Sequence, residues 1–326
     1  MMKDDITIRT LSREDFADVA ALLEAADAVD NQDRLATVED LERDWGWPGY
    51  HGDRDTFVAL DGDRLIGYCE QFLRKPDGTG ESTFYTWGAV HPDYRRRGIG
   101  RTLLEASLAR ANERLAETPD GPVHFHTSGS DAEPGRAALF AELGLRPVRT
   151  YGNLFRPLDG DLPAIDLPAG YRLRPMDPER DVEAVWTVDI TAFRDHWGFV
   201  GFGLDEFRKS IGRPSFRAEL YILAEEEVSG RPVGIALNGI DPDWIEHCGR
   251  QEGWVYTLAV LREHRHRGLG RALLVHSMHL LRREGMEYVT LGADSENLTG
   301  AVRLYERLGF RVRKTQIAFR RTLREP

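Results

Sequence analysis

Two short segments of the sequence combine arginines and glycines in the same order: RRRGIG at residues 95–100 and RHRGLG at residues 265–270. Each lies between an apolar stretch and a segment in which apolar residues recur with the spacing of a helix. Backbone N–H groups at a helix start, glycines that permit close approach and arginines around the rim together form a phosphate site. We therefore predict two anion-binding loops rather than two solvated basic runs. Neither loop contains GxGxxG or GK[ST], so the dinucleotide-binding and P-loop patterns do not fit. The predicted anion-binding residues are Arg95, Arg97, Gly98, Gly100 and Arg101 in the first loop and Arg265, His266, Arg267, Gly268, Leu269, Gly270 and Arg271 in the second.

Both loops belong to a longer internal repeat. The segment VHPDYRRRGIGRTLLEASLARA from Val90 returns as VLREHRHRGLGRALLVHSMHLL from Val260. Other segments of the first half also recur in the second. ITIRTL is similar to YRLRPM, and ALFAELGLRPVR is similar to RLYERLGFRVRK. This self-similarity predicts a tandem duplication of one unit. We expect domains at residues 1–156 and 171–326, joined by a linker at residues 157–170 that is rich in Pro, Gly and Asp.

The order of elements predicts the fold of each unit. Helical stretches occur at residues 13–27 and 179–193, and residues 56–72 place two apolar runs around an Asp-Gly turn, which indicates a hairpin. A strand ending at Val90 or Val260, the arginine-glycine loop, a helix, a strand, a helix and a last strand follow. We therefore predict an α/β fold, with a mixed, mostly antiparallel sheet flanked by helices in each unit.

Composition narrows the classes of protein. A length of 326 residues fits about two domains, and 41% hydrophobic with 30% charged residues is ordinary for a soluble globular protein. The formal charge of −11 disfavours nucleic acid as a partner. Cys69 and Cys248 have neither disulfide-framework nor metal-cluster spacing, which favours a reducing, cytoplasmic setting. Since no apolar run reaches the roughly 18 residues that cross a bilayer, we expect no membrane partner.

The loop pattern RxxGxG after a strand resembles the coenzyme A pyrophosphate loop of the GNAT superfamily of acyl-CoA N-acyltransferases. The segment ADSENLTGAVRLYERLGF, residues 293–310, is similar to the late block of that superfamily. The resemblance covers nearly the whole chain as two units, and the tandem layout is similar to that of the mycothiol synthases, which acetylate a cysteinyl amine. It implies acetyl-CoA as co-substrate and no metal.

The resemblance also implies roles for residues of the second unit. Backbone groups of the strand before the loop hold the acyl thioester, and Asn297 belongs to the cofactor-binding late block. Tyr305 occupies the position of the acid that protonates the departing thiolate, although its apolar helical stripe also fits simple packing. The first unit has Phe140 and Ala132 where the second has Tyr305 and Asn297. We therefore expect the second unit to be active and the first to be catalytically degenerate. The thioester-binding backbone is Leu258, Ala259 and Val260, with Gly88, Ala89 and Val90 as counterparts.

The residue that acts as general base is not given by one matching position of the superfamily pattern. Where members of the superfamily place a glutamate on the strand before the loop, this chain has Trp254. Glu252 lies two residues earlier and on the same strand face if the strand extends that far. It is therefore either the base, acting directly or through a water, or a solvated charge at the strand end.

The acceptor is expected to contact the segment after the first helix of the second unit. This segment concentrates polar and aromatic groups among glycines, which suggests a mobile lid or a surface connection with packed aromatics. Its acidic residues favour a cationic, amine-bearing small molecule. The predicted acceptor-binding residues are Asp189, Asp195, His196 and Trp197.

These observations predict an N-acetyltransferase that moves an acetyl group from acetyl-CoA to a primary amine of a small molecule, by direct attack in a ternary complex. The alternatives are a coenzyme A-binding sensor without turnover and a peptide N-terminal acetyltransferase. The first unit either binds coenzyme A without turnover or closes the acceptor cavity. Either a monomer or a homodimer fits, since the two units can act as a pseudo-dimer.

Overall fold

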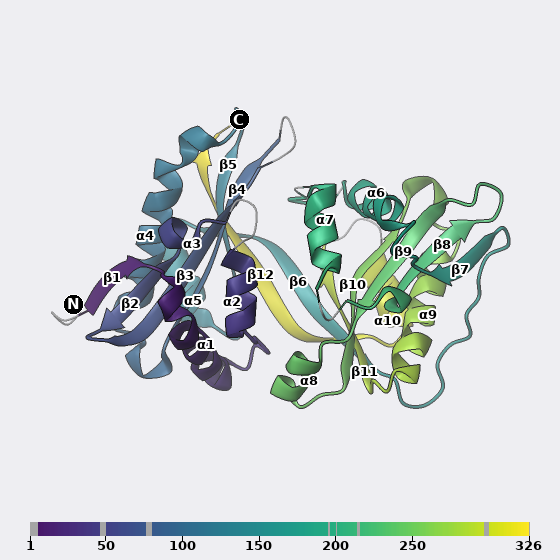
Figure 1. The fold of residues 1–326 in the computed structure, drawn as a ribbon, viewed down its shortest axis with the longest axis horizontal. Helices are drawn as coiled ribbons and strands as arrows, with labels where there is room; N and C mark the ends of the chain where they lie inside the picture. The colour runs from purple at the N-terminus through teal and green to yellow at the C-terminus, as the bar shows by residue number, and fades with distance from the viewer. Residues whose placement is uncertain are drawn as a thin grey trace. The chain divides into compact units, whose positions relative to one another are not determined.

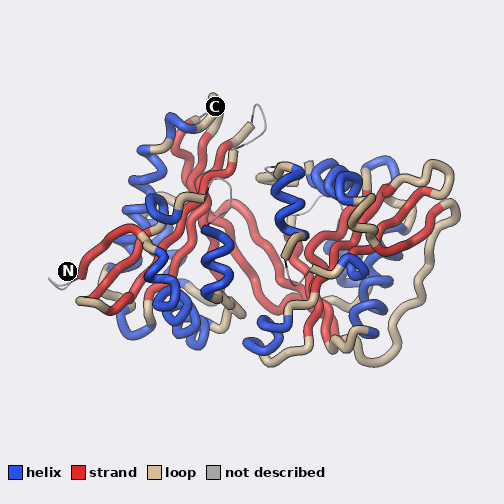
Figure 2. The backbone as a smooth tube through the Cα atoms, viewed as in Figure 1, coloured by secondary structure: helices blue, strands red, loops and turns tan. Residues whose placement is uncertain are grey.

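A computed structural model describes residues 6–45, 50–75, 80–194, 196–199, 201–213, 216–296 and 300–325. The chain divides into two compact units, Met1–Arg149 with Gln316–Pro326, and Thr150–Thr315. Each unit is a sheet flanked by helices (Figures 1 and 2). The predicted α/β fold, with mixed sheet structure flanked by helices in each unit, is confirmed. Among the described residues, no helix is both long and apolar enough to cross a membrane.

The sheet of the first unit has the strand order β1-β2-β3-β4-β5-β12. Its strands are β1 (Ile6–Thr10), β2 (Phe57–Asp61), β3 (Arg64–Arg74), β4 (Ser82–Val90), β5 (Val123–Ser130) and the end of β12 (Arg311–Arg324). Its helices are α1 (Phe16–Asp30), α2 (Val38–Trp45), α3 (Gly52–Asp55), α4 (Ile99–Glu113) and α5 (Pro134–Glu142). The predicted Asp-Gly turn joins β2 to β3, where Gly62 has a φ of +60°.

The second unit repeats this order as β7-β8-β9-β10-β11-β6. Its strands are β7 (Tyr171–Pro175), β8 (Tyr221–Glu226), β9 (Pro232–Gly239), β10 (Glu252–Val260), β11 (Tyr288–Asp294) and most of β6 (Arg146–Pro157). Its helices are α6 (Val182–Phe193), α7 (Leu204–Ile211), α8 (Pro242–Cys248), α9 (Leu269–Arg283) and α10 (Ala301–Arg307). Helices α9 and α6 cover opposite faces of β10, because Leu258 packs with residues of α9 while Ala259 packs with residues of α6.

The last strand of each repeat is exchanged between the units. Strand β6 follows α5 in sequence but pairs with β11, with Phe155 opposite Thr290. Strand β12 follows α10 but pairs with β5, with Phe319 opposite Thr127. Burial explains the exchange, since Leu154 lies in the core of the second unit and Phe319 in the core of the first. The compact units therefore differ from the expected ranges 1–156 and 171–326 by this one strand each, and residues 157–170, expected to be a linker, are grouped with the second unit.

One parallel strand pair in each sheet separates before its strands end. Strand β10 pairs with β11 only over Glu252–Val255, and a β-bulge follows between Val255 and Thr257. Strand β4 pairs with β5 only over Ser82–Tyr85. The following residues of β4 and β10 thus have no strand partner on that side within the described chain. These are the segments that lead into the two arginine-glycine loops.

Candidate active site

Both arginine-glycine loops end on a glycine that begins a helix. Gly98 is the N-cap of α4 with a φ of +87°, and Gly268 is the N-cap of α9 with a φ of +93°. In this left-handed region a side chain is strained, so glycine is required at both positions. Neither cap places a side-chain acceptor on the first N–H groups of its helix. Each loop therefore presents a positive helix end with unused donors, as predicted.

The arginines of the second loop keep their charge uncompensated. Arg265 donates from Nε to the Val260 carbonyl and from Nη2 to the Ala192 carbonyl, both at 2.9 Å. Arg267 donates to the Tyr171 hydroxyl at 3.0 Å, and Arg271 to the carbonyl of residue 164 at 3.4 Å. None of these three arginines contacts a carboxylate of the described chain. The loop is thus oriented by neutral acceptors and remains attractive to an anion.

Carboxylates neutralise two arginines of the first loop. The Arg95 guanidinium binds both Asp30 oxygens, at 2.7 and 2.9 Å. Arg101 forms an ion pair with Glu142 at the end of α5 and a second, at 3.8 Å, with Glu105. The two loops look alike in sequence but differ in net charge, which favours the second as the phosphate site.

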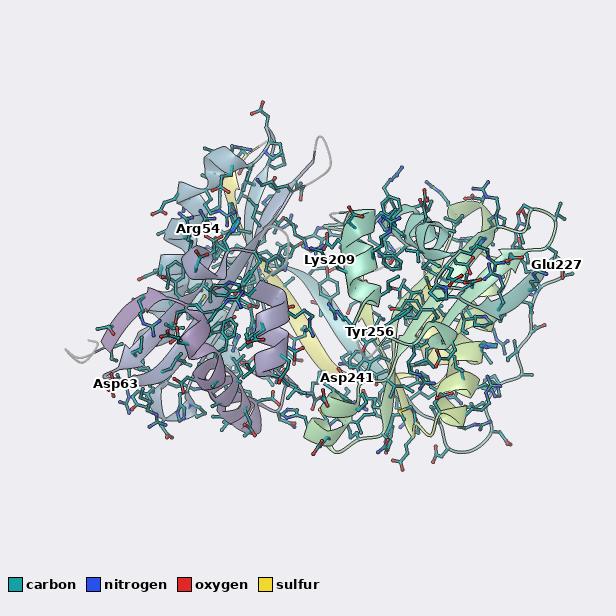
Figure 3. All side chains as sticks on the ribbon, viewed as in Figure 1. Arg54, Asp63, Lys209, Glu227, Asp241 and Tyr256 are labelled. Atoms are coloured by element: carbon teal, nitrogen blue, oxygen red, sulfur yellow. The ribbon has the colours of Figure 1, made fainter. Side chains whose placement is uncertain are left out.

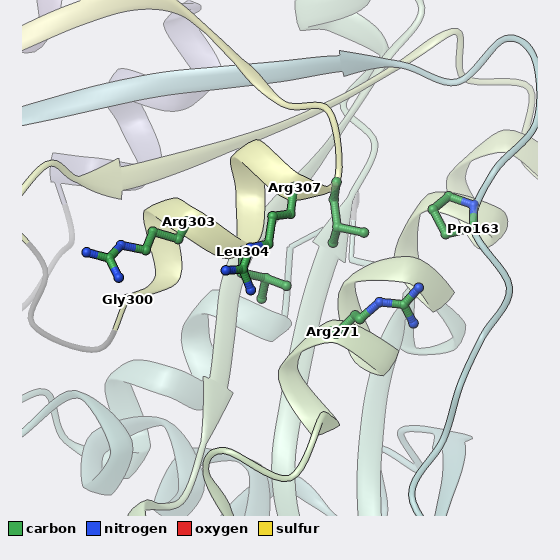
Figure 4. A pocket seen from close by; sticks show the side chains of 7 residues that line it. Pro163, Arg271, Gly300, Arg303, Leu304 and Arg307 are labelled. Carbon is green, nitrogen blue, oxygen red and sulfur yellow. The ribbon is translucent and has the colours of Figure 1, made fainter.

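A basic cavity of about 480 Å³ lies beside the start of α9 (Figure 4). Three guanidinium groups line it, Arg271 from α9 and Arg303 and Arg307 from α10. Its other lining residues are Pro163, Gly300, Leu304 and Leu308. A cavity lined by three arginines that form no ion pair within the described residues, next to the N-terminus of α9, suits a polyanionic ligand. A comparison of the two repeats could have indicated this cavity from sequence, because the first unit has Ala138 and Glu142 at the positions of Arg303 and Arg307.

Tyr305 lies on α10, where it packs in the core against Phe310, with the two ring centroids 6.1 Å apart. Only 7% of the residue is exposed, and its hydroxyl has no hydrogen-bond partner among the described residues. Burial raises the pKa of Tyr305 to about 12. The phenol is thus held protonated at neutral pH, the state that an acid requires.

Glu252 is the first residue of β10 and is fully buried. Its Oε2 atom lies 2.5 Å from Nη1 of Arg313 and 3.3 Å from Nε of Arg250. The expectation that the strand extends to Glu252 is confirmed, whereas the alternative of a solvated strand-end charge is wrong. Two cations replace the water around this carboxylate, which is why it can be buried.

The acceptor-binding residues predicted after the first helix of the second unit are only partly described. Asp189 lies on α6 and is buried, and the His196 ring packs on Phe193 with centroids 4.4 Å apart. Trp197 follows this pair and is half-buried. Asp195 lies outside the described residues, as does the predicted cofactor-binding residue Asn297.

Three aromatic side chains from β10 and α8 lie near the β-bulge. Trp254 stacks on Tyr256 at 6.1 Å and meets Trp244 edge to face at 5.9 Å. Tyr256, labelled in Figure 3, is 59% exposed. Aromatic faces of this kind attract ammonium groups.

Arg136 on α5 is a residue of the first unit that sequence reasoning missed. Its Nη1 atom donates to the Gly88 carbonyl at 3.3 Å, and its Nε atom lies 3.0 Å from Glu133. On the β5 side its Cδ atom lies 3.0 Å from where a Cβ on Gly129 would stand. The Arg136 side chain thus passes between β4 and β5 beyond the point where they pair. The repeat contains the signal, because Ala301 occupies the equivalent position in the second unit.

Among the described residues, no three His, Cys, Asp or Glu side chains cluster as a metal site would require. The site therefore consists of a basic loop, a basic cavity, an unpaired strand segment and a buried phenol, all in the second unit.

Comparisons with known proteins agree with this arrangement. Residues 183–310 match the model of the Acetyltransferase (GNAT) family, and residues 52–144 match an Acetyltransferase (GNAT) domain model. The chain is 33% identical to a mycothiol acetyltransferase of Thermobispora bispora, over 97% of this chain and 100% of that protein. It is 30% identical to a mycothiol acetyltransferase of Streptomyces coelicolor, over 96% and 94% of the two chains.

Solved structures show the same tandem architecture. A GCN5-related N-acetyltransferase from Sphaerobacter thermophilus superposes with a TM-score of 0.78 and 25% identity, covering 99% of this chain and 98% of that one. A tandem GNAT protein from the clavulanic acid biosynthesis pathway shares the fold, with a TM-score of 0.71 and 20% identity over 98% and 99% of the chains. The chain therefore belongs to the GNAT acetyltransferase family, as an acetyl-CoA-dependent acyltransferase with the tandem layout of the mycothiol acetyltransferases.

Proposed function

We propose that the second unit transfers the acetyl group of acetyl-CoA to a primary amine of a small molecule, by direct attack within a ternary complex. The observation that carries this proposal is the uncompensated charge of the second loop and of its neighbouring cavity, which the first unit lacks. The coenzyme A pyrophosphate would bind the N–H groups at the start of α9. Arg265, Arg267 and Arg271 would surround it.

Acetyl transfer needs a donor for the thioester oxygen and an acid for the departing thiolate. Among the described residues, the backbone groups of residues 258–260 have no strand partner towards β11, so those that Arg265 does not occupy are available to the thioester. Tyr305 would protonate the coenzyme A sulfur as the carbon–sulfur bond breaks. A phenol with a pKa of about 12 is protonated at neutral pH, so Tyr305 carries the proton when the reaction begins.

The acceptor is proposed to be a cationic amine that binds near Asp189, Asp195, His196 and Trp197. The aromatic cluster of Trp244, Trp254 and Tyr256 also suits an ammonium group. The names of the relatives point to an amine of the mycothiol type. Trp254 stands at the position where we expect a strand glutamate in that group, so the chemistry of proton removal must differ.

Calorimetric titration of acetyl-CoA into the full chain tests the proposal first. We expect saturable binding, followed by release of free thiol when primary amines are added. A panel of glucosamine, kanamycin, spermidine and a short peptide separates small-molecule from peptide acceptors. Absence of acetyl-CoA binding would refute the proposal, whereas binding without thiol release from any amine would favour the sensor function.

A further inference from the structure

Asp189 is a buried carboxylate with no polar partner among the described residues. It is 8% exposed, and burial raises its pKa to about 6. The other buried carboxylates of the described chain all have a hydrogen-bond or ion-pair partner. They are Asp15, Asp27, Asp55, Asp181, Glu225 and Glu252. An unpaired buried carboxylate destabilises a fold, so its presence points to a function.

The position of Asp189 on α6 places it beside the thioester segment. Its helix neighbours Val188 and Ala192 pack in one cluster with Ala259 of β10. The Ala192 carbonyl also accepts a hydrogen bond from Arg265 of the phosphate loop. Asp189 is thus one helical turn from a residue that contacts the phosphate loop, on the face of β10 opposite α9.

The Asp189 carboxylate acts electrostatically on Tyr221. Burial raises the pKa of Tyr221, the Arg213 charge lowers it and the Asp189 charge raises it. Tyr221 of β8 and Thr257 of β10 both pair with Leu237 of β9, so these three residues lie side by side across the sheet. Thr257 directly follows the β-bulge of β10. Among the described titratable groups, Tyr221 on β8 interacts with the Asp189 carboxylate, and Arg213 after α7 and Tyr256 on β10 each interact with Tyr221.

We propose that Asp189 is the general base of the acetyl transfer. This inference rests on the proposed function. The Asp189 carboxylate takes one proton from the acceptor ammonium, and the neutral nitrogen then forms a bond to the thioester carbon. As the tetrahedral intermediate collapses, the carbon–sulfur bond breaks, Tyr305 protonates the sulfur, and the second nitrogen proton restores the phenol. The products are the amide, coenzyme A and one proton, which Asp189 releases to water.

Glu252 is less suited to this role. Arg313 and Arg250 already neutralise its Oε2 atom, so an ammonium group gains less by approaching it than by approaching Asp189. The Oε1 atom of Glu252 is buried and has no partner among the described residues, and it fits a second contact to the bound acceptor or to a water. Glu252 then acts as a positioning residue.

The test compares Asp189→Asn with Glu183→Gln, which removes an exposed carboxylate from the same helix. We expect Asp189→Asn to lower kcat/KM for the amine by about 100-fold and to remove the inflection near pH 6. Glu183→Gln should leave both unchanged. The measurements are thiol release with the amine that the wild type accepts, from pH 5 to 9, and acetyl-CoA affinity, which should stay constant.

A stability measurement separates catalysis from a structural role. Since the folded-state pKa lies above the unfolded value, Asp189 reduces stability as pH rises from about 4 to 6, and the penalty remains above pH 6. Asp189→Asn should therefore raise Tm by several degrees at pH 8 and change it little at pH 4. Unchanged kcat/KM, or a fall in both activity and Tm, would overturn the assignment. A wild type that releases no thiol with any amine would instead overturn the proposed function, while the Tm comparison would still report on Asp189.

An independent observation concerns the first unit, where Arg136 fills the space between β4 and β5. The equivalent space of the second unit borders Ala301, whose side chain is too short to cross it. The first unit also carries Glu142 where the basic cavity has Arg307, and Glu142 pairs with Arg101. We infer that the first unit binds no acetyl-CoA, contrary to the expectation for Ala89, Val90, Arg95, Arg97, Gly98, Gly100 and Arg101, and that each chain binds one.

Introducing the same side chain into the second unit tests this inference. We expect one acetyl-CoA per wild-type chain by calorimetry and none for Ala301→Arg. Glu306→Arg adds an arginine to an exposed position of the same helix and should retain one site. Two sites in the wild type, or full affinity in Ala301→Arg, would overturn the inference. Near-ultraviolet circular dichroism of Ala301→Arg verifies that loss of binding does not reflect unfolding.

Discussion

Replacing Gly268 with tryptophan is expected to weaken acetyl-CoA binding by about 100-fold or more, because about 3 kcal/mol of contacts to the phosphate would be lost. The indole would lie over the first N–H groups of α9, where no side-chain cap stands. It would also meet Pro168, 3.6 Å from the position of a Cβ on Gly268. Calorimetric titration measures the loss directly.

Gly98→Trp is the matched control for this experiment. Gly98 and Gly268 have nearly the same φ and both begin a helix after an arginine loop, so each substitution costs a similar 1–2 kcal/mol or so of backbone strain. Only the second loop is expected to hold a ligand. Equal loss of binding in both variants would show that strain, rather than the phosphate site, is responsible, and would argue against the second unit as the binding unit.

Tyr305→Phe should reduce kcat by about 100-fold, since the departing thiolate loses its acid. Acetyl-CoA affinity should remain unchanged, because the phenol hydroxyl acts on the sulfur only as its bond breaks. Thiol release under saturating acetyl-CoA measures kcat, and calorimetry measures affinity. A sensor without turnover would have no rate to lose and would keep its affinity, so this variant also separates the two functions.

Stability provides the control for Tyr305→Phe. The hydroxyl has no partner within the described residues, so its removal breaks no hydrogen bond there, and we expect Tm to stay within about 2 °C of the wild type. Phe140→Tyr makes the reverse change at the equivalent position of the first unit. It should leave kcat unchanged, and a large loss of activity in Phe140→Tyr would mean that the first unit takes part in catalysis.

Local patterns predicted much of this protein. The duplicated loops, the helices that follow them and the Asp-Gly hairpin depend on residues close together in sequence, and the structure has all of them where the patterns placed them. The glycine at each helix start was recognisable because only glycine tolerates its backbone conformation without strain. The sequence also placed Tyr305 on the helix that it occupies.

Properties that depend on distant residues were not predictable in this way. The neutralisation of Arg95 requires Asp30, and the burial of Glu252 requires Arg313, which is remote in sequence. The absence of a polar partner for Asp189 among the described residues depends on side chains from other elements, and no sequence pattern in α6 predicts it. Arg136 was the exception, because comparing the two repeats position by position would have singled it out.

The exchanged strands make the folding of the two units depend on different parts of the chain. Thr150–Thr315 is one continuous segment that contains every strand of its own sheet. The unit that begins at Met1 must wait for Gln316–Pro326, because β5 is an open edge until β12 arrives. The half that is translated first therefore cannot complete its sheet until the whole chain has been made. A chain truncated after Thr315 and released from the ribosome should expose the β5 edge to chaperones, although the Thr150–Thr315 unit is complete.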